Sequence, residues 1–202
     1  MIKKSLLAIA ISSAVMISAC NNTQESTQQN TAKKTTEKTV AALDASAQAN
    51  KLFDDLYKAA IMRSPMYQTY LGIKDDYDKW NDISEENTLK ELAISKQNLA
   101  TVNAIDVSQL DAQTKISHTL FVQQLENNIA DHKWRFHSYP VNQMFGLHSQ
   151  IPAFLINQHS IANEKEAQDY ISRVKGTEKL LSQLVDNLKQ REERGIIVPK
   201  FV

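Results

Sequence analysis

Hydrophobic residues recur at helical spacing over most of the chain from Leu43 onward. Leu52, Phe53 and Leu56, for example, fall at positions i, i+1 and i+4, which share one face of an α-helix. No segment shows a convincing alternation of apolar and polar residues of the kind that marks a half-buried strand. The pattern therefore predicts four helices, three of them long, over about residues 43–63, 84–102, 111–136 and 163–194.

Start and stop signals support these boundaries. Ser84 stands directly before two glutamates, as an N-cap followed by an acidic first turn does. Asn163 with Glu166 three residues later is typical of a capping box. Pro65 ends the first helix, and Gly195 suits the residue after the last one. The buried face predicted for that last helix consists of Ala167, Tyr170, Ile171, Val174, Leu181, Leu184, Val185 and Leu188.

Composition agrees with an all-α fold. The 202 residues include only four glycines and four prolines, so few residues interrupt the helix-forming segments. The length suits a single domain of ordinary size. Lys plus Arg equals Asp plus Glu, at 23 each, and this balance argues against a nucleic-acid-binding surface.

The first twenty residues, "MIKKSLLAIAISSAVMISAC", have the pattern of an export signal that ends before Cys20. Two lysines precede an apolar run that is shorter than the roughly 20 residues needed to span a bilayer. The run ends in Ile17-Ser18-Ala19-Cys20, which resembles the bacterial lipobox, and Cys20 is the only cysteine of the chain. The resemblance implies cleavage before Cys20 and lipidation of its thiol. The alternative is an ordinary secretory signal in which the cysteine is incidental.

These patterns divide the chain into three predicted segments. Residues 1–19 are the predicted signal peptide, and residues 20–42 are a predicted disordered tether, because Thr, Gln, Asn and Lys offer almost no apolar surface to bury. Residues 43–202 are the helical domain. By resemblance to lipoproteins, Asn21 in place of Asp after the cysteine favours the outer membrane of the cell envelope over the inner one.

The histidines do not predict a metal site. Zinc ligands on one helix need i, i+4 spacing, and no "HExxH" occurs in the chain. His118 and His132 are 14 residues apart, and the pair His132 and His137 has a spacing of five. The sequence also lacks a "GxSxG" elbow and a glycine-rich phosphate loop, so no catalytic residue, metal ligand or cofactor is predicted within it.

The stretch "YPVNQMFGLHSQIPAFL" is unusual, because prolines and a glycine predict a loop that is nonetheless rich in apolar residues. Such a segment either packs against the domain as a structural plug or lines a ligand cleft. The candidate cleft-lining residues are Asn142, Gln143, Met144, Gly146 and His148.

Four segments in this order, "SPMYQTYLGIKDDYDKWNDIS", "YPVNQMFGLHSQIPAFLINQHSI", "EAQDYISRVKGTEKLLSQL" and "REERGIIVPKFV", resemble the opening part of the bacterial family called domain of unknown function 885. Members of that family look like zinc peptidases of the gluzincin type, are largely α-helical, and include many lipoproteins. Their "HExxH" helix and further glutamate ligand have no counterpart in this sequence. The resemblance therefore implies an N-terminal helical layer of a larger peptidase-like fold, truncated at its C-terminal end.

Two functional hypotheses remain open. The chain is either the N-terminal fragment of a lipid-anchored, zinc-metallopeptidase-like protein, inactive alone, or a non-enzymatic helical lipoprotein that binds peptides or another protein. In both cases the membrane is a partner through the lipid on Cys20. Zinc and a peptide substrate are implied only for full-length relatives.

Overall fold

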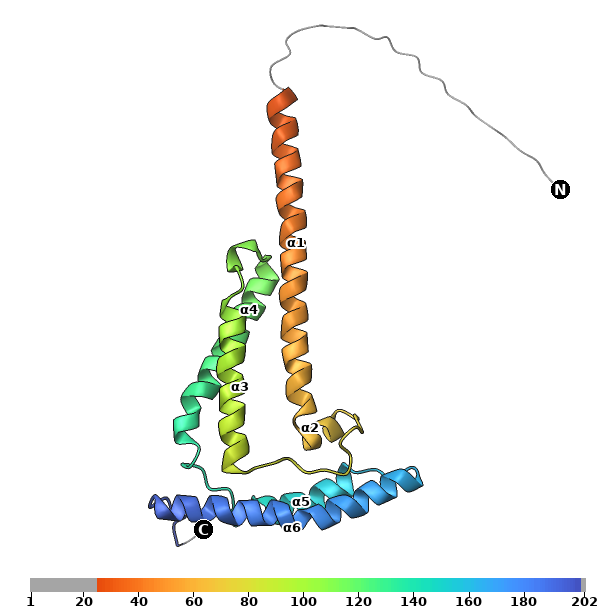
Figure 1. Ribbon diagram of the computed structural model, residues 1–202, viewed down its shortest axis with the longest axis vertical. Helices are drawn as coiled ribbons and strands as arrows, with labels where there is room; N and C mark the ends of the chain where they lie inside the picture. The colour runs from red at the N-terminus through yellow and green to blue at the C-terminus, as the bar shows by residue number, and fades with distance from the viewer. Residues whose placement is uncertain (1–24, 201–202) are drawn as a thin grey trace, which may run out of the picture. The chain divides into compact units, whose positions relative to one another are not determined.

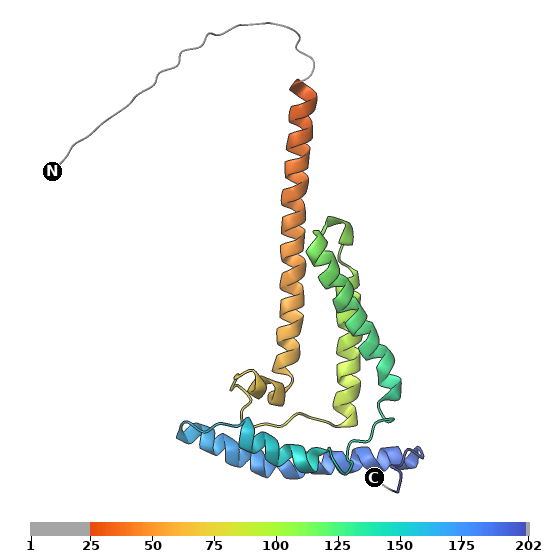
Figure 2. The ribbon, with the colours of Figure 1, turned by 180° about the vertical axis from the view of Figure 1, so that it is seen from behind.

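The computed structural model describes residues 25–200, with side chains described from residue 39 onward. This part of the chain contains six α-helices, two short 3₁₀ turns and no strand, so the predicted all-α fold is confirmed. Helices α3 and α4 lie side by side, as do α5 and α6 (Figure 1, Figure 2). The elements are α1 Glu25–Met62, α2 Pro65–Tyr70, α3 Glu85–Asn103, η1 Val107–Gln109, α4 Ala112–Asp131, η2 His132–Trp134, α5 Leu147–Asn157 and α6 Glu164–Glu193.

Helix α1 begins earlier than the composition predicts. It starts at Glu25 and so includes much of the segment for which disorder was expected. Neither glycine nor proline occurs between Glu25 and Met62, so a helix nucleated in the packed part can propagate through this polar stretch. The signal peptide and Cys20 lie outside the described residues, and their roles stay predictions. Of the helices in the described part of the chain, none has the length and apolar character to cross a bilayer.

Side-chain caps begin the three long helices that the sequence predicts after Pro65. Ser84 Oγ accepts a hydrogen bond from Asn87 N at 3.2 Å at the start of α3. Asn163 Oδ1 accepts one from Glu166 N at 3.0 Å at the start of α6. Asp111 does the same for α4, with 2.7 Å from its Oδ1 to Thr114 N. Each cap satisfies a backbone N–H that has no partner within its helix.

The prediction of an irregular stretch between Pro140 and Pro152 is wrong for its second half, where α5 forms. Gly146 takes the position before its first residue, and Ser149 N and Gln150 N donate to the Gly146 carbonyl at 3.1 and 3.0 Å. Pro152 lies within the helix, where its missing N–H removes one backbone hydrogen bond. Burial of Ile151, Phe154 and Leu155 offsets that loss.

A first apolar core joins α1, α3 and α4. Its buried members are Ala49 and Phe53 of α1, Val102 of α3, Leu125 of α4, and Leu110 before α4. The Phe53 ring stacks on that of Phe121 with centroids 5.1 Å apart. Aliphatic and aromatic side chains thus hold these helices together, as the periodicity of the sequence predicts.

A second apolar core lies between α5 and α6. Ile151 and Leu155 of α5 bury against Leu180 of α6, with Trp80 and Tyr170 packed around them.

The buried face of α6 differs from the predicted apolar stripe. Leu184 is buried as expected, but Ile171, Val174 and Val185 are 53%, 47% and 47% exposed. Two arginines, Arg173 and Arg191, are buried in their place. The face that packs against the protein is rotated away from the apolar stripe, because the guanidinium groups bond to loop carbonyls that no aliphatic side chain could satisfy.

Candidate functional site

The loop before α5 closes on itself through a short turn. Val141 and Gly146 form an isolated antiparallel bridge, and Asn142 N donates to Phe145 O at 2.8 Å. Asn142 Oδ1 accepts from Met144 N at 2.9 Å and from Phe145 N at 2.8 Å. One asparagine side chain therefore fixes the turn through its oxygen.

Gly146 is required at the base of this turn. Its φ of +151° lies where residues with a side chain are strained, and a Cβ there would stand 2.8 Å from His148 Nδ1 and 3.1 Å from Pro140 O. The glycine thus lets the His148 ring lie directly against the turn. Its role is to shape the loop.

A groove of apolar character runs between this loop, the C-terminal half of α6 and the segment after it. One hollow of about 420 Å³ adjoins a second of about 240 Å³, since Val141, Leu188 and Val198 line both. Of the predicted cleft-lining residues, Asn142, Gln143 and His148 line the larger hollow. The smaller hollow is also lined by Tyr139, Pro140, Val185, Lys189, Arg191, Glu192, Ile196 and Ile197.

The other two predicted residues lie elsewhere. Met144 is 69% exposed at the tip of the turn, beside Phe145 at 62%, and Gly146 is buried beneath it. Ile151, Phe154 and Leu155 are buried, as the structural-plug alternative expects, and Val141, Asn142, Gln143 and His148 line a hollow. Whether the groove receives a ligand stays a prediction.

Arg191 supports the floor of the groove. Its guanidinium donates to Ser138 O at 3.1 Å and to Arg135 O at 2.9 Å, which ties α6 to the end of η2 and the residues after it. Burial lowers its pKa, and the nearby Glu85 carboxylate opposes that shift. Arg135, Arg191 and Arg194 all approach the ring of Phe136, at 4.3, 5.6 and 4.0 Å from the centroid. These cations pack around one aromatic ring beside the groove.

A second cluster surrounds Arg173, which no periodicity of the sequence predicts. Arg173 is fully buried, and its Nε donates to Lys79 O at 2.9 Å. Its Nη1 donates to His159 Nδ1 at 3.0 Å, and its Nη2 donates to Thr69 Oγ1 at 2.8 Å. The guanidinium also lies near the rings of Tyr77, Trp80 and Phe154, at 5.2, 5.6 and 4.9 Å from their centroids.

Arg173 has no carboxylate partner among the described ion pairs. Burial lowers its pKa to about 10, so it remains a cation at neutral pH. Carbonyl dipoles, a hydroxyl and aromatic faces replace the counterion. Arg173 therefore fastens the segment from Thr69 to Trp80 onto α6.

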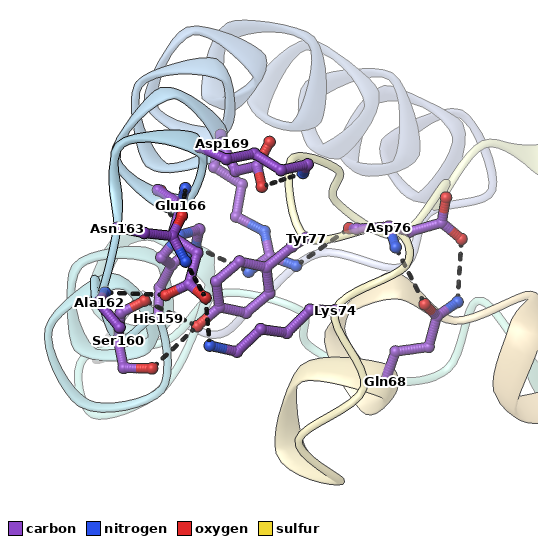
Figure 3. A network of polar contacts seen from close by, with 12 residues as sticks. Gln68, Lys74, Asp76, Tyr77, His159, Ser160, Ala162, Asn163, Glu166 and Asp169 are labelled. Carbon is purple, nitrogen blue, oxygen red and sulfur yellow. Dashed lines mark hydrogen bonds and ion pairs between the residues drawn. The ribbon is translucent and has the colours of Figure 1, made fainter.

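A network of hydrogen bonds and ion pairs joins the segment of Lys74 and Tyr77 to Ser160 and to the start of α6 (Figure 3). Glu166 accepts from Lys74 Nζ at 2.7 Å and from Ala162 N at 2.8 Å, and the bond from Lys74 is the main reason that the pKa of Glu166 is lowered. Gln68, itself fully buried, donates to Asp76 Oδ2 at 2.9 Å and accepts from Asp76 N at 3.2 Å. Hydrogen bonds from Lys79 and then Gln68 lower the pKa of Asp76.

The described residues do not fit a zinc site. Among the side chains of residues 39–200, no group of three or more His, Cys, Asp or Glu gathers closely enough to hold a metal ion. Two of the histidines are instead buried against backbone carbonyls: His118 Nε2 lies 3.1 Å from Val102 O, and His159 Nε2 lies 3.2 Å from Glu166 O. No residue of the described part of the chain is therefore assigned to zinc.

Comparison with known proteins identifies the family. A family model described as "Bacterial protein of unknown function (DUF885)" matches residues 65–202. The chain belongs to the DUF885 family. The DUF885 match includes the groove loop, the Arg173 cluster and all of α6. No curated protein and no solved structure matches the chain.

Proposed function

We propose that this DUF885 chain forms one helical wall of a peptide-binding cleft in a lipid-anchored, zinc-metallopeptidase-like protein. The observation that carries the proposal is the groove lined by Val141, Leu188 and Val198, with Asn142, Gln143 and His148 at one end. A largely apolar groove with a few polar groups suits an extended peptide, whose side chains bury while its amides find hydrogen-bond partners.

The chain is not catalytic by itself in this proposal. Its sequence contains no "HExxH", and its described residues offer no cluster of metal ligands. Zinc and the group that activates water belong to another part of the functional protein. The residues of this chain bind and orient the peptide.

Binding to the groove can be measured with matched variants. The full chain in detergent is titrated against fluorescein-labelled peptides with apolar residues, and fluorescence anisotropy gives the Kd. Leu188→Asp, which places a charge in the groove, should weaken binding by roughly ten-fold or more. Val174→Asp changes a similarly exposed residue on the same helix outside the groove and should leave the Kd unchanged. Equal loss in both variants, or no binding by the parent chain, would exclude the proposal.

Anchoring is tested separately. In a bacterial host, labelled fatty acid should enter the parent chain and none should enter a Cys20→Ser variant, because the thiol is the predicted acceptor. Fractionation should then find the parent with the outer membrane. Label on both chains, or on neither, would contradict a lipid on Cys20.

A second candidate function is a docking module for another protein. Ile171, Val174 and Leu181 form an exposed apolar stripe on α6 beyond the groove, at 53%, 47% and 37% exposure. An apolar stripe of this kind suits contact with a partner. In the titration above, sensitivity to Val174→Asp but not to Leu188→Asp would favour this function.

A further inference from the structure

His159 occupies an unusual place between a buried cation and a backbone carbonyl. Only 4% of its surface is exposed, and it lies in the connection between α5 and α6. Arginine can only donate, so the contact between Arg173 Nη1 and His159 Nδ1 requires an unprotonated Nδ1. The proton then resides on Nε2, which donates to Glu166 O. The geometry therefore requires a neutral imidazole.

A proton on Nδ1 would disrupt this arrangement. It would remove the acceptor of the Arg173 hydrogen bond and place two buried cations within 3.0 Å of each other. Burial lowers the pKa of His159 below its ordinary value of 6.5. The hydrogen bond to the Glu166 carbonyl opposes this shift, and the charge of Arg173 adds to it. The unfolded chain therefore protonates His159 near pH 6.5, whereas the folded chain does so only at lower pH.

The carboxylates around His159 already have cationic partners. On α6, Glu166 accepts from Lys74 and Asp169 accepts from Lys165 at 2.6 Å. Both carboxylates raise the pKa of His159, but neither is hydrogen-bonded to its ring. From the opposite side, the Tyr77 ring lies 3.9 Å from the imidazole, centroid to centroid, and Lys74 lies over that tyrosine. The Tyr170 ring closes the third side at 5.2 Å.

The same contacts hold the segment of residues 69–80 on α6. Arg173 bonds Thr69 and Lys79, the Tyr77 hydroxyl donates to Ser160 O at 3.1 Å, and Trp80 Nε1 donates to Arg173 O at 2.7 Å. His159 contacts both Arg173 and Tyr77, so a change at its ring reaches each of these bonds.

We propose that His159 and Arg173 form an acid-sensitive latch, which holds residues 69–80 on α6 at neutral pH and releases them when His159 is protonated. The sign follows from the geometry. The unfolded or opened chain binds a proton near pH 6.5, whereas the closed latch excludes it until the pH is lower. The latch is fully stable above pH 6.5 and weakens as the pH falls from there toward the folded pKa of His159.

Trp80 can report the opening directly. A Trp134→Phe background removes the other tryptophan, which is exposed and outside the cluster. In the full chain in detergent, lowering the pH from 8 to 5 should shift Trp80 emission to longer wavelength in a single-proton transition centred below 6.5. His159→Gln keeps a neutral acceptor and donor and should abolish the transition. His118→Gln, at a buried histidine that bonds Val102 O in the first core, should retain it.

The outcomes decide the proposal. A transition that persists in His159→Gln, or a parent chain whose Trp80 emission stays constant to pH 5, would overturn it. If His159→Gln fails to fold, an NMR titration of the parent replaces it. The expected result is an Nε2-protonated His159 whose titration coincides with shifts of residues 69–80. A His159 pKa of 6.5 or above, or titration without those shifts, would refute the latch.

Discussion

The two cores of this chain are held together by different chemistry. Phe53, Val102 and Leu125 join α1, α3 and α4 through apolar contact, with His118 and Thr114 as hydrogen-bonded polar members. The second region packs Leu155 and Leu180 together, but its largest fully buried side chain is Arg173. The first region follows from hydrophobic periodicity, whereas the second depends on a cation that satisfies loop carbonyls.

This difference has consequences for stability. Burial of aliphatic side chains is insensitive to pH and tolerates substitutions that conserve volume. A buried guanidinium is different, because each of its partners is left without a hydrogen bond when it is removed. The second region is therefore the more easily disrupted by a single change.

Loss of Arg173 should have the largest effect. Arg173→Ala leaves His159 Nδ1, the Thr69 hydroxyl and the Lys79 carbonyl without their donor. Since each unsatisfied buried group costs about 1–3 kcal/mol, we expect the free energy of unfolding to fall by at least about 3 kcal/mol. Chemical denaturation of the full chain at pH 7.5 measures it, with Lys175→Ala, an exposed change on the same helix, as a control.

Leu125→Ala in the first core provides the comparison with Arg173→Ala. It should cost about 3 kcal/mol through the cavity it leaves, by the same amount at pH 7.5 and at pH 5.5. In Arg173→Ala, the free energy of unfolding should also depend less on pH than in the parent chain. The reason is that the cation beside His159 is gone, so protonation of His159 costs less in the folded state. Equal pH dependence in the two variants would show that the two cores do not differ as described.

Gly146→Ala should have a smaller effect on stability and a local effect on the groove. The positive φ costs about 1–2 kcal/mol, and the new Cβ displaces His148. Gly72→Ala is the matched control, since Gly72 also has a positive φ but has nothing within 4 Å of an added Cβ. Denaturation should show a loss of stability for both variants, and the larger loss for Gly146→Ala, whose Cβ meets His148 and the Pro140 carbonyl. Only Gly146→Ala should also weaken peptide binding. Unaltered binding in that variant would show that the shape of the turn does not affect the groove.

The sequence predicts the helices far better than it predicts their contacts. Caps at Ser84 and Asn163 were identified correctly because they depend on residues three positions apart. Helix α5 was missed because Pro152 and Gly146 signal a loop, while tertiary burial of Phe154 outweighs the lost hydrogen bond. Arg173 was missed because its partners, from Thr69 to His159, come from other parts of the chain.

The candidate site was predictable in part. An apolar loop with scattered polar residues drew attention to residues 141–148, four of which line a hollow. The opposite wall, at Leu188 and Val198, could not be inferred, because only the folded chain brings α6 and the segment after it against the loop.

The central claim is that this groove receives a peptide. The most direct test is ¹⁵N NMR of the full chain in detergent, recorded during titration with an extended apolar peptide. The account predicts progressive shifts at Val141, Gln143, His148, Leu188 and Val198, with Phe53 and Val102 of the first core unchanged. Absence of shifts, or shifts confined to the Ile171–Leu181 stripe, would contradict it.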